Sequence, residues 1–319
     1  MSGETDLATV VGTRPQFIKA AMTIRGLEER GLPQRLIHTG QHYDREMDEV
    51  FFEDLDIPRP DANLGVGSAP PSRQTGAMMD ALEAHLQERE ERLDAMVVFG
   101  DTNSTLAAAL VAAQHQIPLV HVEAGLRSYD RSMPEEVNRV VTDELSEVLC
   151  APTPRAVRQL AEEGIEEGVF RTGDVMRDAV LAYRQRAEDR YPVERVAGHA
   201  AGSYVLATVH RARNTDQLDR LEAIMEGLGR LEGPVVLPAH PRTRERLEEI
   251  AVPANVEVRA PVRYLKMLAL LGGARAVCTD SGGLQREAYW CRVPCATLRP
   301  ETEWPETTEG GWNRIVDVD

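Results

Sequence analysis

Three acidic residues stand close to apolar segments in an arrangement that can place their carboxylates together. Asp101 comes two residues after the apolar run Ala95–Phe99, Glu123 directly follows the run Leu119–Val122, and Glu135 opens a segment with helical spacing. Because the carboxyl ends of parallel strands meet at one edge of a sheet, we expect these side chains to lie near one another. Crowded carboxylates push their pKa values apart, so such a site can hold a general base and a general acid. For Asp101 alone, a helix N-cap is the structural alternative.

Two turns have the composition of anion-binding sites. The first leads into a helical segment, where Arg14 and Lys19 add positive charge to the free N–H groups of the helix start. The second turn contains residues that let backbone amides approach a phosphate closely: Ser281, Gly282 and Gly283. Glu287 follows one helical turn later and can accept hydrogen bonds from ribose hydroxyls. Together the turns indicate a bound diphosphate, and the dinucleotide-cofactor motif GxGxxG is absent.

Two histidines end apolar runs in the second half of the chain. His210 ends the predicted strand Tyr204–His210, and His240 follows Val235–Pro238. A histidine at a strand end can transfer a proton or bind phosphate, although a purely structural role is the alternative. Because these histidines lack a nearby cluster of metal ligands in the sequence, we expect no metal site.

Apolar runs alternate with helical segments along the whole chain, which predicts parallel sheets covered by helices on both faces. The predicted strands are Leu7–Val11, Leu36–His38, Ala95–Phe99, Leu119–Val122, Val148–Ala151, Tyr204–His210, Val235–Pro238, Ala276–Thr279 and Cys295–Leu298. One predicted helix is Pro15–Arg30, with Gly31 at its C-cap. The pattern restarts after the charged segment Ala182–His199. We therefore expect an α/β chain with two Rossmann-like domains, residues 1–180 and 181–319, and a central cleft that holds the ligand.

The composition excludes several classes of partner. The chain has 319 residues and a net charge of −16, which argues against binding nucleic acid or anionic membranes. No apolar run of about 18 residues is present, and the N-terminus has no secretory pattern. The four cysteines form no metal-type CxxC pair, so we expect reduced thiols in a cytoplasmic protein.

The chain resembles the non-hydrolysing UDP-N-acetylglucosamine 2-epimerases. The resemblance extends over nearly the whole chain and rests on VVGTRPQFIKAA, HTGQHYD, GDTNSTLA, HVEAGLRSYDRSMPEEVNR, ATVHRARNTD, HPRT and TDSGGLQREA. It implies a glycosyltransferase-B-like fold, no cofactor and a homodimer. It also implies conversion of UDP-GlcNAc to UDP-ManNAc, by anti elimination of UDP to a 2-acetamidoglucal followed by re-addition.

Motif by motif, the resemblance assigns roles to the candidate residues. It makes Asp101, Glu123, Glu135 and His210 the catalytic residues, without deciding which acid removes the C2 proton. It places the UDP-sugar against Arg14, Lys19, Ser281, Gly282 and Glu287.

Several departures from the family pattern leave the substrate open. Arg213 stands where relatives carry an acid, Arg286 replaces the first Glu of QEEA, and Trp304 lies in TEWPE where relatives show TERPE. These features are similar to the branch that acts on UDP-2,3-diacetamido-2,3-dideoxyglucuronate. A hydrolysing 2-epimerase, a glycosyltransferase of the same fold and an inactive UDP-sugar-binding protein are competing interpretations of the same motifs. The resemblance also implies C-terminal helices beyond residue 319, and the extra residues in HTGQHYDREM argue against assuming a regulatory site there.

Overall fold

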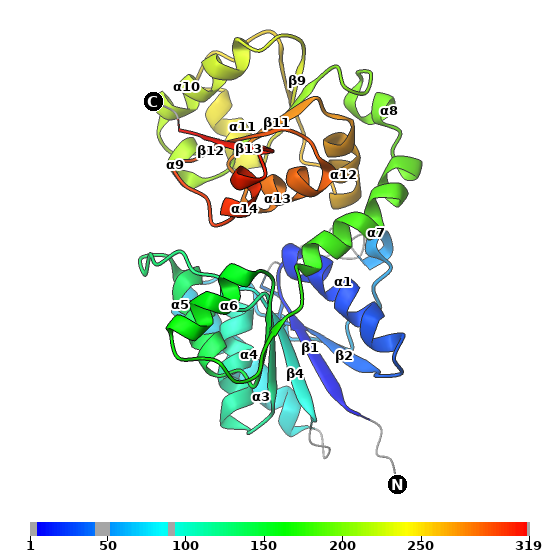
Figure 1. Cartoon of the computed structure of the whole chain (residues 1–319), viewed down its shortest axis with the longest axis vertical. Coiled ribbons are helices and arrows are strands. Elements are labelled where there is room, and N and C mark those ends of the chain that lie inside the picture. Colours follow the sequence, from blue (N-terminus) through cyan, green and yellow to red (C-terminus); the bar gives the residue numbers. More distant parts are fainter. Residues whose placement is uncertain (1–4, 42–51, 89–92, 318–319) are drawn as a thin grey trace. The chain divides into compact units, whose positions relative to one another are not determined.

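The computed structural model describes residues 5–41, 52–88 and 93–317, so residues 42–47 of HTGQHYDREM lie outside the described residues (Figure 1). The chain divides into two compact domains, Met1–Ala179 and Val180–Asp319. Each contains a parallel sheet with helices packed against it, which confirms the expected α/β class with two Rossmann-like domains. In the described part of the chain, no helix is long and apolar enough to cross a membrane.

The first domain contains a seven-stranded parallel sheet with the order β3-β2-β1-β4-β5-β6-β7. Its strands are β1 (Leu7–Val11), β2 (Gln34–His38), β3 (Ala62–Asn63), β4 (Ala95–Phe99), β5 (Leu119–Val122), β6 (Val148–Ala151) and β7 (Val169–Arg171). Its helices include α1 (Arg14–Glu28), α3 (Pro71–Gln87), α4 (Asn103–Gln114), α5 (Pro134–Glu144) and α6 (Pro154–Glu162). The chain moves outward in one direction from β1 and in the other from β4, so the switch point lies between these two strands.

The second domain contains a six-stranded parallel sheet with the order β10-β9-β8-β11-β12-β13. Its strands are β8 (Val205–Thr208), β9 (Val235–Pro238), β10 (Val256–Arg259), β11 (Ala276–Thr279), β12 (Cys295–Leu298) and β13 (Asn313–Val316). Its helices are α7 (Val175–Arg190), which contains the domain boundary, α8 (Val193–Ala197), α9 (Ala212–Thr215), α10 (Leu218–Gly229), α11 (Pro241–Leu247), α12 (Tyr264–Gly273), α13 (Gly282–Cys291) and α14 (Pro305–Glu309). The switch point of this sheet lies between β8 and β11.

Most predicted elements are present, and the differences have local causes. The predicted strand Tyr204–His210 is too long, because β8 ends at Thr208 and the next backbone amides donate to the carboxylate of Asp280. The predicted cap at Gly31 is wrong, since the C-cap of α1 is Glu29. The four cysteines are free thiols.

Gln16 connects the start of α1 to the neighbouring strand β4. Its side-chain oxygen accepts hydrogen bonds from the amides of Gly12 and Thr13 at 2.9 and 3.1 Å. Its nitrogen donates to the carbonyl of Phe99 and to the Thr105 hydroxyl, both at 2.9 Å. The side chain is 1% exposed, so the Gly12 and Thr13 amides depend on Gln16 instead of water as their acceptor. Gln16 therefore joins the two turns on either side of the first switch point.

Replacing Gln16 should destabilise the first domain. We expect Gln16→Leu to lower the free energy of unfolding by about 2–4 kcal/mol, because the Gly12 and Thr13 amides stay buried without their acceptor. The exposed Gln87→Leu, which removes only a 3.2 Å contact with Glu83, should change it by less than about 0.5 kcal/mol. Equilibrium urea denaturation measures both, and equal effects would contradict the role given to Gln16.

Candidate active site

Glu123 has an unusual backbone conformation for a residue with a side chain. It directly follows β5 and has a φ of 73°, in the left-handed region that side chains other than glycine rarely adopt. Its carboxylate lies 2.6 Å from Nζ of Lys19 on α1, and both side chains are less than one-tenth exposed. The structure therefore brings Lys19, expected at a phosphate, against one of the expected catalytic acids.

Asp101 belongs to a second ionic cluster at the same edge of the sheet. Its carboxylate accepts a hydrogen bond from Nη2 of Arg139 on α5, and its carbonyl accepts one from the Asn138 side chain at 2.9 Å. The alternative role as a helix N-cap is wrong, because Thr102 caps α4 by accepting from the amide of Thr105. Burial would lower the pKa of Arg139, but the nearby Asp101 carboxylate outweighs it and raises that pKa. Asp101 and Glu123 are thus each matched with a fixed cation.

Glu135 and Glu136 differ sharply although they are neighbours on α5. Glu135 is exposed and forms no ion pair with any residue that the structure describes. Glu136 is 2% exposed and accepts from the amides of Ser128 and Tyr129 at 2.9 and 2.8 Å, and from Arg139 at 3.1 Å. Burial would raise the pKa of Glu136, but these donors outweigh it and hold the pKa below its ordinary value. Glu136 therefore fixes the loop before α5 through the Ser128 and Tyr129 amides, whereas the carboxylate of Glu135 is accessible to a ligand.

Arg14 is the first residue of α1 and is half-buried beside the capping residue Thr13. Its position at the carboxyl end of β1 is the one expected from the sequence. Gly12, Arg14, Lys19, Asp101 and Glu123 all lie on segments that follow β1, β4 or β5. The strand order therefore places all five residues at the carboxyl edge of the first sheet.

In the second domain, the buried carboxylate of Asp280 holds His210. Asp280 follows β11 and His210 follows β8, so the two residues flank the switch point of this sheet. The Oδ1 atom of Asp280 lies 3.1 Å from Nδ1 of His210. The carboxylate also accepts from the amides of His210 and Arg211 and from Asn214. Burial would raise the pKa of Asp280, but the hydrogen bond from His210 and these other donors outweigh it and lower that pKa.

This contact defines what His210 can do. Asp280 is fully buried, whereas the side chain of His210 is 51% exposed. An ionised acceptor at Nδ1 favours the form with a proton on that nitrogen, which leaves Nε2 as the accessible atom. The sequence contained the signal for Asp280, since it lies in the TDSGG segment, but we had expected that turn to contact an anion only through its amides.

The expected anion turn opens α13. Ser281 is its N-cap and accepts a hydrogen bond from the amide of Leu284 at 3.2 Å, and Gly282 and Gly283 form the first helical positions. Arg299 lies nearby, in a two-bond ion pair with Glu303 at 2.7 and 2.9 Å. His240 is the exposed N-cap of the short helix α11, and its imidazole has no hydrogen-bond partner in the described part of the chain.

Glu287 is buried one turn inside α13, and burial raises its pKa to about 7. The charge of the neighbouring Arg286 lowers this pKa, but burial has the larger effect. The Arg286 guanidinium itself lies over the ring of Trp304, 3.9 Å from the ring centroid. Two departures from the family pattern, Arg286 and Trp304, are therefore one cation–π contact.

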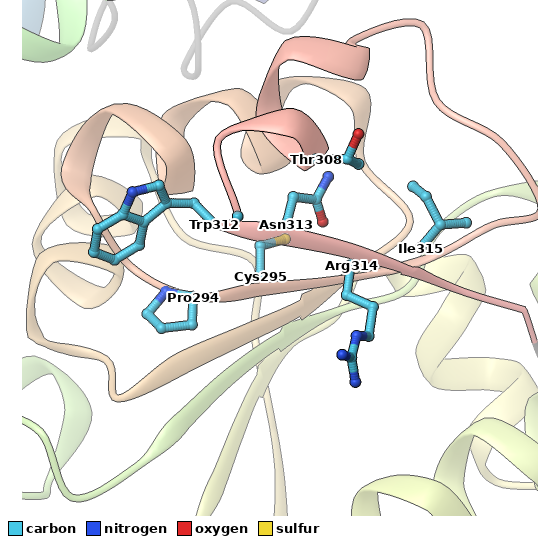
Figure 2. Close-up of a pocket in the computed structure, with 8 residues that line it drawn as sticks. Pro294, Cys295, Thr308, Trp312, Asn313, Arg314 and Ile315 are labelled. Atoms are coloured by element: carbon cyan, nitrogen blue, oxygen red, sulfur yellow. The ribbon is translucent and has the colours of Figure 1, made fainter.

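Figure 2 shows a different cavity, of about 580 Å³, beside the edge strand β13. Trp312 and Asn313 line it together with Pro294 and Cys295. None of the candidate site residues contributes to this cavity. Among the described residues, no group of three or more histidine, cysteine, aspartate or glutamate side chains could hold a metal ion.

Glu287 should make stability depend on pH. Its pKa is about 7 in the folded chain and 4.5 ordinarily, so the folded state binds more protons between these values. The free energy of unfolding should therefore fall by about 3 kcal/mol as the pH rises from about 4.5 to about 7. Urea unfolding of Glu287→Gln and the parent chain at both ends of this range checks the sign. As the pH rises from about 4.5 to about 7, the parent chain should lose stability relative to Glu287→Gln. If the parent loses none relative to the variant, the raised pKa of Glu287 is contradicted.

Comparison with known proteins places this geometry in a family. The family model described as UDP-N-acetylglucosamine 2-epimerase matches residues 25–319. The chain is 45% identical over 317 residues to a UDP-N-acetylglucosamine 2-epimerase homolog of Methanococcus maripaludis. It is 43% identical over 318 residues to the UDP-2,3-diacetamido-2,3-dideoxy-D-glucuronate 2-epimerase of Pseudomonas aeruginosa. Each alignment covers 97% of this chain and 88% of the relative.

A solved structure agrees with these relatives. The crystal structure of Methanocaldococcus jannaschii UDP-GlcNAc 2-epimerase in complex with UDP-GlcNAc and UDP aligns with a TM-score of 0.89 at 42% identity. The alignment covers 99% of this chain and 90% of that chain. The expected glycosyltransferase-B-like class is thereby confirmed. The chain belongs to the UDP-N-acetylglucosamine 2-epimerase family.

Proposed function

We propose that the chain is a UDP-sugar 2-epimerase that converts UDP-GlcNAc to UDP-ManNAc. The observation that carries the proposal is the pairing of Glu123 with Lys19, and of Asp101 with Arg139, at the carboxyl edge of the first sheet. The family match and the relatives named for this activity support it. A glycosyltransferase has no comparable need for a set of acids in its first domain.

The proposed reaction exchanges the configuration at C2 through elimination and re-addition. A base removes the C2 proton while the C1–O bond breaks, which yields UDP and a 2-acetamidoglucal. UDP then adds back at C1, and an acid delivers a proton to the other face of C2. Because no carbonyl activates the C2 proton, cleavage of the C1–O bond must run ahead and leave positive charge on the ring. Carboxylates near C1 and C2, and cations near the departing diphosphate, stabilise that charge distribution.

The first domain, residues 1–180, supplies the sugar chemistry in this proposal. Asp101, Glu123 and Glu135 are the acids that move protons at C2, and Lys19 balances the charge of Glu123 at 2.6 Å. The exposed carboxylate of Glu135 is accessible, in contrast to its neighbour Glu136. Arg14 and Lys19 remain the proposed cationic contacts of the UDP-sugar in this domain.

The second domain, residues 181–319, binds UDP in this proposal. His210 directs Nε2 to the leaving diphosphate, as its contact with Asp280 supports. Ser281, Gly282, Gly283 and His240 contact the phosphates. Glu287, neutral below a pH of about 7, exchanges hydrogen bonds with the ribose hydroxyls. No redox cofactor enters the proposed reaction, because elimination of UDP and its re-addition include no oxidation or reduction step.

A second candidate substrate is UDP-2,3-diacetamido-2,3-dideoxyglucuronate. The relative that carries this name is 43% identical, the same value as a relative named UDP-N-acetylglucosamine 2-epimerase. The contact between Arg286 and Trp304 belongs to the segment that resembles this branch. Incubating the chain with each UDP-sugar, and observing the anomeric protons by NMR, identifies the substrate. Release of the free 2-epimeric sugar together with UDP would indicate a hydrolysing enzyme instead.

We also propose a cytoplasmic homodimer. Four free cysteines support a reducing compartment. The dimer rests on the family resemblance, and light scattering coupled to size-exclusion chromatography measures it.

The acids should be separable from UDP binding. We expect Asp101→Asn and Glu123→Gln each to lower kcat by about 10²–10⁴-fold, because a proton-transferring group is lost. The affinity for UDP, measured by calorimetry, should change little in both variants. The exposed Glu249→Gln, which removes only a surface pair with Arg246, serves as the control. Near-parental kcat in either site variant would remove that acid from the mechanism.

A further inference from the structure

A buried chain of charged side chains lies behind the acid-bearing loops of the first domain. His121 of β5 contacts Asp143 of α5, Asp143 contacts Arg127, and Arg127 contacts Glu163. His121 and Asp143 are each fully buried, and only Glu163 reaches the surface. The proposed mechanism uses none of these four residues.

The hydrogen bonds of His121 define its charge. Its Nε2 lies 2.8 Å from the carbonyl oxygen of Gly100, which can only accept a hydrogen bond. Its Nδ1 lies 2.7 Å from Oδ1 of Asp143. The other oxygen of Asp143 accepts from Nη1 of Arg127 at 2.6 Å and from the amide of Gly125 at 3.1 Å. A carboxylate with these donors is ionised, so both ring nitrogens of His121 face acceptors.

We infer that His121 is a buried imidazolium that positions both acid-bearing loops. A neutral ring would set a nitrogen lone pair against the Gly100 oxygen at 2.8 Å. With His121 cationic, the positive charges of His121 and Arg127 match the negative charges of Asp143 and the partly exposed Glu163, so the four-residue cluster carries no net charge. Lys19, which approaches Gly100 from α1, is already paired with Glu123 and does not supply that balance.

The two hydrogen bonds at the ends of this pair hold the backbone beside the proposed acids. The Gly100 carbonyl immediately precedes Asp101, and the Gly125 amide lies two residues after Glu123. Gly125 has a φ of 80°, and a Cβ there would lie 2.6 Å from the carbonyl of Ala156, so this turn is tightly confined. His121 and Asp143 are positioning residues, and their catalytic consequence rests on the proposed function.

The charge of His121 can be measured without any activity. Two-bond ¹H–¹⁵N correlation spectra of the ¹⁵N-histidine-labelled full chain distinguish an imidazolium from either neutral tautomer. At about pH 8 we expect one histidine with both nitrogens protonated. Loss of that signal in His121→Gln assigns it. If that variant fails to fold, replacing each other histidine in turn assigns it by elimination. A neutral His121 at this pH overturns the inference.

Asp143→Asn tests the positioning role. Its amide keeps the size of the side chain but removes the ionic partner, so His121 should become neutral at about pH 8. We expect kcat to fall about 100-fold, because the proposed acids are displaced, with KM nearly unchanged. The matched control is Glu83→Gln, which alters an exposed histidine–carboxylate pair with His115 at 3.6 Å and should change neither readout.

Unchanged kcat with a neutral His121 would overturn the positioning role. A chain inactive on both UDP-sugars would contradict the proposed function, while the spectra would still decide the charge of His121.

Discussion

The first domain depends on matching each buried or half-buried carboxylate at one sheet edge with a fixed cation. Lys19 lies against Glu123, Arg139 contacts Asp101 and Glu136, and Arg127 contacts Asp143. Without these cations, carboxylates this close would protonate or repel one another. Each cation offsets the negative charge of the carboxylate that it contacts, so several acids can lie at one edge of the sheet. The departing diphosphate adds further negative charge, and the proposed UDP contacts therefore include the cations Arg14 and Lys19 of this domain as well as the phosphate-binding residues of the second domain.

The second domain has a buried carboxylate at the corresponding edge of its own sheet. Its central buried carboxylate, Asp280, binds the amides and the imidazole at the end of β8 from the neighbouring strand β11. In each sheet, the candidate residues therefore flank the point where the strand order reverses. At such a point two loops leave the sheet in opposite directions, and a ligand can approach the strand ends between them. The side chains that join those loops, Gln16 in one domain and Asp280 in the other, are buried and fully hydrogen-bonded.

Much of this architecture could be predicted from the sequence because both faces of the central strands are covered. Continuous apolar runs such as Ala95–Phe99 and Val235–Pro238 have the predicted bounds. Strands β10 and β13 escaped prediction because they are edge strands, in which charged residues such as Glu257 and Arg314 interrupt the apolar pattern. The candidate acids were identifiable because they follow strands. The residues that hold the acids or their loops, Arg139 and Asp143, and the residue that holds His210, Asp280, were not distinguished. A sequence does not show which charged side chain is buried against which partner.

The central claim is that the C2 proton is removed and replaced by protein acids while UDP departs and returns. Its most direct test is proton NMR of UDP-GlcNAc, or of the diacetamido-uronate if that is the substrate, incubated with the chain in D₂O. The account predicts a 2-epimeric UDP-sugar that carries deuterium at C2, because the proton returned to carbon comes from an acid equilibrated with solvent. An epimeric product that retains the original proton at C2 would contradict it.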